Sequence, residues 1–395
     1  MHPFQQIAQR IKENIVQKEV KNEKVLFQGG EYSAFPLIED NFIVLDDNLK
    51  SKNASLSPSL SQQKIAFIDG GNAELLKTPG FSLQFIRVAA CVFQANKSIT
   101  MEQYEYYVLI SAVENENDIY YEVDYFSSEN NQRQSNGKMN ETINEKILPR
   151  KEDLCYYSYD KTIVTGVDRG EISKMGEICR KFSELLLAKK IAQELQENDL
   201  VVLDNSLKSY YTNEEIYWQQ LFTVVTARKM ILAGLTKTTT LLTDKGNSVI
   251  SVLHLLSEKK QLQDKCWYYY PVVSITKAID GQLDKHLQFD KHPAEILFVK
   301  LHKLANYIFK LEIYNQSFRA ENLQLLLSML QLQANDAFFV GYPYGLVKVD
   351  QFARVSNKEK EYLQVLFMAN AGQNYAFIKQ ALSASNAHGI LDGKS

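Results

Sequence analysis

Apolar residues crowd into strand-like runs in the first half of the chain. Four such runs predict four strands: KIAFID, FSLQFIRVAACVFQ, YEYYVLISAV and IYYEVDYF. A Ser-rich polar stretch, residues 51–63, precedes them and predicts a linker or surface loop. A second polar stretch, residues 127–146, follows them and predicts a mobile loop.

Helical spacing dominates elsewhere. The isoleucines of residues 5–20 recur on one face and predict a short amphipathic helix. A long helix is expected in EISKMGEICRKFSELLLAKKIAQELQEN, with the short buried strand LVVL after it. AEILFVKLH and YIFKLEIY predict another strand pair, and ENLQLLLSMLQLQ predicts a second helix. Several strands, a long helix and a further strand indicate an α/β fold of the mixed α+β kind.

Composition narrows the class of protein. The 395 residues are 45% hydrophobic and 23% charged, with a net charge of −3, which is typical of a globular protein and gives no general signal for nucleic-acid binding. The four cysteines form no CxxC pair, so we expect reduced thiols and a cytoplasmic location. The N-terminus has no apolar segment of a signal peptide, and no apolar run is long enough to span a membrane.

Two aspartates follow apolar runs directly. Asp69 ends IAFID and Asp204 ends LVVLD, and each precedes a residue suited to a turn. An aspartate at such a place can simply start a turn or cap a helix. Two of them at the ends of neighbouring strands favour a functional pair, because chemistry gathers at strand ends in sheets flanked by helices.

A third acid is predicted from helical geometry. Glu184 shares a helix stripe with Leu187 and Ile191, so it is expected to face the body of the protein, where an unpaired carboxylate is unfavourable. Glu177 is the rival on the same stripe, about 10 Å along the axis. Either glutamate could instead pair with a lysine such as Lys181.

Three converging carboxylates can hold divalent cations through their oxygens, and two such cations can cleave a phosphodiester. The two glycines after Asp69 would then let a bulky anionic substrate approach the strand. This interpretation treats the strand as ending at Asp69.

These residues resemble a known family. IDGGNAE, DLVVLDNSL, LAGLTKTTTLL and GYPYGLVKVDQFARVS are similar, in order, to the successive motifs of the NurA family. The resemblance runs from about residue 64 to residue 356, with KLHKLANYIFKLEIY in the expected place before the last motif.

The resemblance implies a metal-dependent DNA nuclease of DNA end processing. It implies an RNase H-like core with a mixed β-sheet flanked by helices, a requirement for Mn²⁺ or Mg²⁺, a homodimer with a central channel, and a HerA-like hexameric ATPase as partner. Asp69, Glu184 and Asp204 match the metal ligands, and Lys237 matches a family lysine near the phosphate or in support of the site. Repair and antiviral defence are both compatible with it.

The last motif departs from the family pattern. Tyr342 matches the family tyrosine, but Asp350 stands where a histidine is usual. Gly345 and Asn205 also replace the usual proline and glycine. If this stretch is extended, the even spacing of eight puts Tyr342 and Asp350 on one face, so both are expected to line the site. An aspartate there cannot act as a cationic donor at neutral pH.

The expected organisation is an N-terminal helical arm and linker (residues 1–60), a nuclease domain (61–380, with the mobile loop at about 127–147) and a tail (381–395). Two functions stay open. One is a DNA nuclease, an exonuclease or endonuclease acting with a translocase. The other is a catalytically weak scaffold subunit that binds DNA and docks on the translocase.

Overall fold

A computed structural model describes residues 25–26, 42–45, 61–128, 146–243, 245–270 and 293–385. The chain divides into two compact units, each built from several segments. Unit 1 comprises Met1–Gln62, Leu203–Lys208 and Ile231–Tyr344, and unit 2 comprises Gln63–Val202, Ser209–Met230 and Gly345–Ser395. The predicted N-terminal helix and residues 129–145 of the loop predicted at 127–146 lie outside the described residues.

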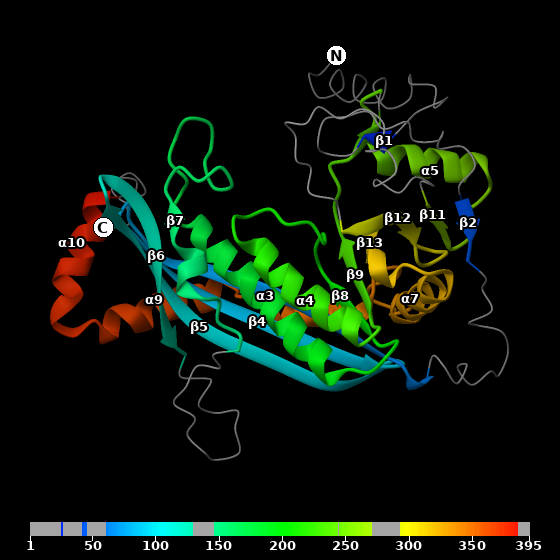
Figure 1. Ribbon diagram of the computed structural model, residues 1–395, viewed down its shortest axis with the longest axis horizontal. Coiled ribbons are helices and arrows are strands. Elements are labelled where there is room, and N and C mark those ends of the chain that lie inside the picture. Colours follow the sequence, from blue (N-terminus) through cyan, green and yellow to red (C-terminus); the bar gives the residue numbers. More distant parts are fainter. Residues whose placement is uncertain are drawn as a thin grey trace. The chain divides into compact units, whose positions relative to one another are not determined.

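Unit 2 is built on long antiparallel strands (Figure 1). These are β3 (Lys64–Lys77), β4 (Phe81–Gln94), β5 (Lys97–Asn115), β6 (Asp118–Ser127) and the short β7 (Tyr156–Tyr157), each paired with the next. The strand β8 (Leu200–Leu203) lies beside β3 in the strand order. The four predicted strands are therefore confirmed, and β4 is buried along nearly its whole length because helices cover both of its faces.

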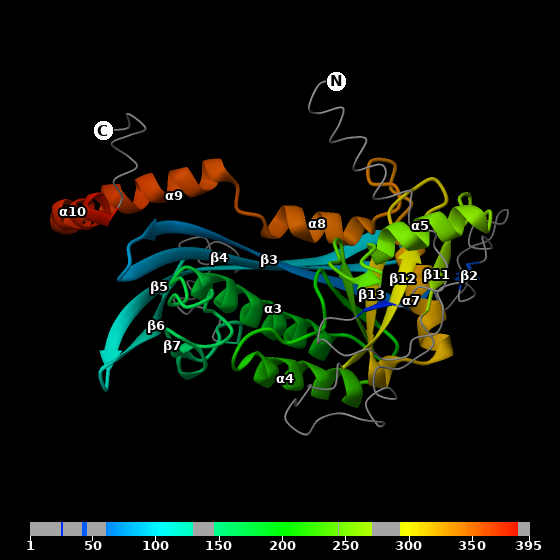
Figure 2. The ribbon, with the colours of Figure 1, turned by 90° about the horizontal axis from the view of Figure 1, so that it is seen from above.

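Helices lie on both faces of β3 and β4 (Figure 2). One layer holds α3 (Lys174–Glu194) and α4 (Glu214–Ala227). The other holds α8 (Tyr344–Ala353) and α9 (Asn357–Asn370), after which comes α10 (Tyr375–Ser385). The start of α9 is determined locally, since the Ser356 hydroxyl accepts a hydrogen bond from the Glu359 N–H at 3.2 Å, as in a capping box.

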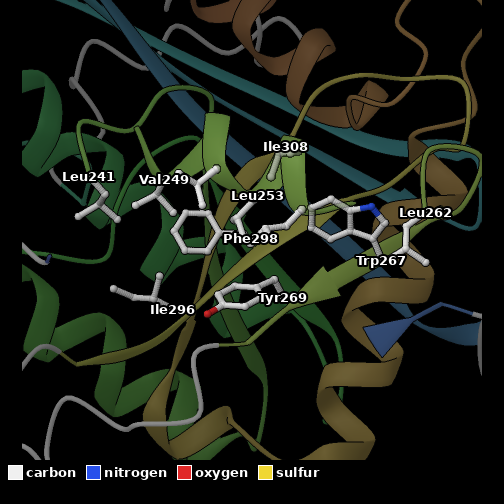
Figure 3. Packing of buried hydrophobic residues seen from close by; sticks show 11 residues of the cluster. Leu241, Val249, Leu253, Leu262, Trp267, Tyr269, Ile296, Phe298 and Ile308 are labelled. Carbon is white, nitrogen blue, oxygen red and sulfur yellow. The ribbon is translucent and has the colours of Figure 1, made fainter. Parts of the chain in front are cut away.

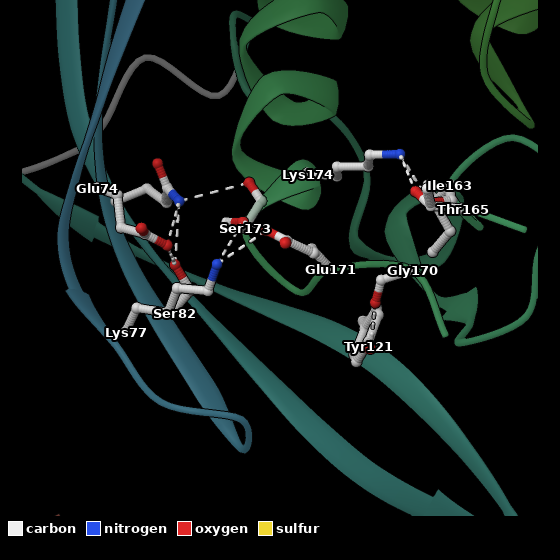
Figure 4. A network of polar contacts seen from close by, with 11 residues as sticks. Glu74, Lys77, Ser82, Tyr121, Ile163, Thr165, Gly170, Glu171, Ser173 and Lys174 are labelled. Carbon is white, nitrogen blue, oxygen red and sulfur yellow. Dashed lines mark hydrogen bonds and ion pairs between the residues drawn. The ribbon is translucent and has the colours of Figure 1, made fainter. Parts of the chain in front are cut away.

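A polar network fixes the start of α3 (Figure 4). The Gln84 amide on β4 donates to the Ser173 carbonyl at 3.4 Å, and the Lys77 ammonium on β3 donates to Glu171 at 2.9 Å. A Cβ at Gly176 would lie 2.5 Å from the Gln84 side chain, so a larger residue there would require Gln84 to move. The network sets where α3 crosses the sheet, and therefore where its later residues lie.

Unit 1 contains a second set of antiparallel strands. In order they are β2 (Phe42–Val44), β11 (Trp267–Tyr269), β12 (Ala294–Lys300), β13 (Phe309–Tyr314) and β9 (Ile231–Thr236). The helices α5 (Val249–Lys259) and α7 (Ala320–Gln333) belong to the same unit, as do the paired short strands β1 (Val25–Leu26) and β10 (Leu242–Thr243). The predicted β12–β13 pair and the predicted second helix are confirmed.

The core of unit 1 forms where α5 packs on the strands (Figure 3). Trp267 and Tyr269 of β11 and Phe298 of β12 are completely buried against Val249 and Leu253 of α5. Burying these aromatic and aliphatic side chains stabilises the unit by about 1.5–3 kcal/mol for each large residue.

The described chain confirms the mixed α+β class. None of its helices is long and apolar enough to cross a membrane. The four cysteines are free, and burial raises the pKa of the Cys91 thiol to about 11. A thiol of that pKa is inert at neutral pH, so Cys91 belongs to the core.

Candidate active site

Asp69 lies in the interior of a strand, so the expectation that the strand ends there is wrong. β3 continues through Gly70 and Gly71 to Lys77, and Asp69 pairs with Ala89 of β4. A Cβ at Gly70 would lie 2.5 Å from the Glu184 Oε1 on α3, and one at Gly71 would lie 2.3 Å from the Ala353 carbonyl oxygen. The glycines therefore let helices approach both faces of β3, and this explains the DGG sequence without a substrate.

Gly71→Ala is expected to destabilise unit 2 by about 1–3 kcal/mol, because the new methyl group meets a backbone carbonyl that cannot turn away. The C-terminal end of α8 would have to shift. Gly80→Ala is the matched control, since its Cβ would meet only the Thr78 Oγ1 at 4.0 Å. Urea unfolding of both variants checks the difference, and equal midpoints would contradict this packing role.

Glu184 lies on the buried face of α3 and Glu177 on the exposed face. The Glu184 Oε1 accepts from the Arg180 Nη1 one turn earlier, and the Lys181 ammonium lies 4.0 Å from Oε2. Glu177 instead accepts from the Tyr211 hydroxyl at 3.4 Å. Burial, with Glu177 nearby, raises the pKa of Tyr211 to about 12. Glu184 is thus the glutamate of the stripe that reaches β3, as its contact with the Gly70 position indicates.

Asp350 lies on a helix, so the extended run considered for VGYPYGLVKVD is wrong. Pro343 lies directly before the first residue of α8, and Asp350 follows in the second turn of the helix. The carboxylate oxygens of Asp350 and Asp69 lie within 4.8 Å of one another. Arg354, one turn further along, binds Asp350 with its Nη2 at 2.5 Å.

A buried arginine connects α8 and α9 to the sheet, and the sequence analysis missed it. Arg87 on β4 binds Glu105 of β5 at 2.6 Å, donates to the Arg354 carbonyl at 3.0 Å, and pairs with Glu359 of α9. These two glutamates raise the pKa of Arg87 in spite of burial. The one signal in the sequence is a charge inside the apolar run FIRVAA. This cluster positions the end of α8, and so Asp350, over β3.

The other three predicted site residues, Asp204, Lys237 and Tyr342, lie together in unit 1. The Lys237 ammonium, directly after β9, lies 2.5 Å from the Asp204 Oδ2, and the Tyr342 hydroxyl donates to Oδ1 at 3.4 Å. The same ammonium lies 5.5 Å from the centre of the Tyr342 ring. Asp204 is nearly buried, with 7% of its side chain exposed, so these partners hold its orientation.

A second residue that sequence analysis missed, Glu312 of β13, supports the loop after Asp204. Its buried carboxylate accepts from the Ser206 hydroxyl at 2.9 Å, the Leu207 N–H at 2.7 Å and the Lys310 ammonium at 2.5 Å. A Cβ at Gly234 of β9 would lie 2.2 Å from the Asn205 carbonyl oxygen, so this glycine lets the loop lie close to the strand. Within unit 1, Asp204 is thus placed at the start of a loop that these contacts hold against β9 and β13.

The residues around β3 fit a divalent cation. Two carboxylate oxygens within 4.8 Å of one another can both contact an ion at about 2.0–2.6 Å, the range for Mg²⁺ and Ca²⁺. All the candidate ligands are carboxylates, the donors that such hard ions prefer. The Glu184 Oε1 accepts from Arg180, and the Lys181 ammonium lies 4.0 Å from Oε2.

Comparison with solved structures gives similarity over nearly the whole chain. The NurA nuclease from Sulfolobus solfataricus is 10% identical with a TM-score of 0.49, over 94% of this chain and 95% of that one. A second NurA structure is 9% identical with a TM-score of 0.48, over 95% of this chain and 98% of that one. Human ENDOV is 8% identical with a TM-score of 0.34, over 76% of this chain and 85% of that one. No family model and no curated protein sequence matches the chain.

Proposed function

We propose that this protein is a divalent-metal-dependent nuclease that cleaves DNA, with an RNase H-like core. The observation that carries the proposal is the pair of acids at β3: oxygens of Asp69 and Asp350 lie within 4.8 Å of one another although 281 residues separate them in the chain. Glu184 approaches the same strand one residue further on, at Gly70. Two carboxylates this close repel each other, and a bound divalent cation would compensate that repulsion.

Asp69, Glu184 and Asp204 are the proposed ligands of Mn²⁺ or Mg²⁺, with Asp350 as a further carboxylate. The assignment of Asp204 rests on the order of the sequence motifs. Bound cations would activate a water molecule and stabilise the leaving oxygen of the phosphodiester. The chain's own part is to hold the carboxylates: Gly70 and Gly71 admit the helices, and Arg87 anchors the end of α8.

Lys237 and Tyr342 are proposed to support Asp204. The Lys237 ammonium compensates the charge of the Asp204 carboxylate, and the Tyr342 hydroxyl donates a hydrogen bond to its Oδ1, which holds its orientation. Because 44% of the Lys237 side chain is exposed, this lysine is also accessible to a phosphate group of a substrate.

Labelled linear DNA, double-stranded and single-stranded, tests the proposal when it is incubated with the full chain. Cleavage is expected with Mn²⁺ or Mg²⁺ and not with EDTA, and removal of the chelator followed by new metal should restore it. Isothermal titration calorimetry without DNA should detect Mn²⁺ binding. A protein that binds Mn²⁺ and DNA but leaves DNA intact would favour the scaffold alternative, and one that cleaves only RNA would overturn the choice of substrate.

Asp350→Ala is expected to lower the cleavage rate by about 10–100-fold, the usual effect of losing a group that tunes a metal site. Unfolding should change little, because the partly buried Asp350 pairs with the exposed Arg354, and a pair with one exposed partner contributes about 0–1 kcal/mol. Asp350→His should lower the metal concentration required. The rate of cleavage against Mn²⁺ concentration checks both, and an unchanged curve for Asp350→Ala would place this residue outside the site.

We also propose, from the family resemblance, that the chain forms a homodimer and works with a HerA-like hexameric ATPase in DNA repair or antiviral defence. Sedimentation of the purified chain tests the first proposal, and a monomer at micromolar concentration would contradict it. Co-purification with a HerA-like ATPase from the same genome tests the second.

A further inference from the structure

Arg180 on α3 is only partly used by the protein. Its Nη1 donates to the Glu184 Oε1 and to the Gly70 carbonyl at 3.3 Å. An arginine has five N–H donors in a planar fork. Among the described residues, no hydrogen bond is made by Nε or Nη2 of Arg180. The Nε/Nη2 edge, which suits two oxygens of one anion, is therefore left without a protein acceptor.

This edge is accessible. The Arg180 side chain is 23% exposed, whereas that of Glu184 is 5% exposed. The neighbouring cation on the helix is used differently, since the Lys181 ammonium lies 5.3 Å from the centre of the Trp218 ring and only 9% of its side chain is exposed. Arg180 is thus the basic residue beside Glu184 that can still reach a ligand.

Carboxylates around Arg180 keep it protonated and hold one of its nitrogens in place. Glu184, and after it Asp69 and Glu177, raise the pKa of Arg180 against the effect of burial. The orientation of the Arg180 guanidinium is fixed, because its Nη1 donates both to Glu184 on α3 and to the Gly70 carbonyl on β3. An arginine with one nitrogen fixed and the opposite edge open is preorganised for an oxyanion, which lowers the entropy lost on binding.

We propose that Arg180 binds the scissile phosphate of the substrate, with its Nε/Nη2 edge on the non-bridging oxygens while Glu184 holds its Nη1. This inference rests on the proposed nuclease function and adds the residue that would stabilise charge on the phosphate during cleavage. A purely structural role, in which Arg180 only neutralises Glu184, makes different predictions for metal binding.

Three variants separate these roles: Arg180→Ala, Arg180→Lys and, as control, Lys190→Ala. Lys190 forms an ion pair with Glu194 at 2.9 Å, with the same spacing of four on the same helix, and a second ion pair with Glu102 of β5 at 2.8 Å. Arg180→Ala should lower the cleavage rate by about 10²–10³-fold, the range for loss of one donor to a transition-state oxyanion. Arg180→Lys keeps the charge but not the fork, so it should recover at most about tenfold of that loss. Lys190→Ala should cleave like the wild type.

Two further measurements do not depend on cleavage. In EDTA, the salt dependence of DNA binding by Arg180→Ala should have a slope smaller by about one ion contact, as for any lost phosphate contact. Mn²⁺ affinity without DNA should stay within about threefold of the wild type, or tighten, because a ligand oxygen is released. If Mn²⁺ affinity and cleavage fall together, or if Arg180→Lys cleaves like the wild type, the proposal is overturned.

Thermal melting shows whether Arg180→Ala folds. If it does not, Arg180→Lys and Arg180→Gln replace it in the measurements of cleavage, of the salt dependence of DNA binding and of Mn²⁺ affinity. If the wild type cleaves no DNA, the proposed function fails first. The salt slope still decides the phosphate contact in that case: a smaller slope supports it, and an unchanged slope overturns it.

Discussion

Asp69→Asn is expected to lower DNA cleavage by about 10³-fold or more. Loss of a metal ligand removes several kcal/mol of stabilisation from the transition state, and about 4 kcal/mol corresponds to a factor of about 10³. The fold should be retained, because the Gly70 N–H that donates to the Asp69 Oδ1 at 2.8 Å can donate equally to an asparagine oxygen. Cleavage rates at saturating Mn²⁺, with circular dichroism of the same samples, check the expectation.

Asp124→Asn is the matched control for this change. Asp124 lies on β6 of the same unit, is largely exposed and pairs with Lys151 at 2.5 Å. An exposed pair of this kind contributes about 0–1 kcal/mol, so neither stability nor cleavage should change measurably. If Asp69→Asn retains wild-type cleavage while Mn²⁺ is still required, the catalytic metal lies elsewhere.

Glu312→Ala is expected to destabilise unit 1 by about 3–5 kcal/mol, the cost of removing one partner from a buried ion pair. Glu312 is completely buried, and its loss leaves the Ser206 hydroxyl, the Leu207 N–H and the nearly buried Lys310 ammonium without this acceptor. Because the same carboxylate holds the loop after Asp204, DNA cleavage should fall as well. Urea unfolding followed by circular dichroism measures the first effect.

Glu258→Ala tests whether this effect is specific to a buried carboxylate. Glu258 lies on α5 of the same unit, about half-exposed, 3.6 Å from His254. Its removal should change stability by less than about 0.5 kcal/mol. Equal midpoints for Glu312→Ala and Glu258→Ala would show that the loop after Asp204 is held by other contacts.

The α+β class and most of the regular elements could be predicted from the sequence, because local apolar periodicity determines them. The apolar stripe of α3 predicted that Glu184 faces inward but left Glu177 as a rival on the same stripe. Only the structure separates the two, because Glu184 is buried and Glu177 is exposed. The order of motifs indicated a resemblance to the NurA family, because short motifs can be read from the sequence without knowing the fold.

Tertiary structure alone decided what the glycines and the last motif do. Gly70 and Gly71 look like a strand end in the sequence, yet β3 continues through them by pairing with β4. Residues 70 and 71 are glycines because residues of α3 and the end of α8 occupy the space that two side chains would need. Asp350 lies on a helix, and packing brings it to Asp69 across 281 residues of chain.

The roles of the buried charged residues could not be predicted from the sequence either. In the sequence, Arg87 and Glu312 are single charged residues within apolar runs, and nothing there indicates their partners. Those partners come from distant segments: Glu359 of α9 for Arg87, and Ser206 after β8 for Glu312. Local periodicity determined the elements of this protein, and long-range pairing of buried polar groups decided how its acids are held, because such pairing depends on residues that meet only in the folded chain.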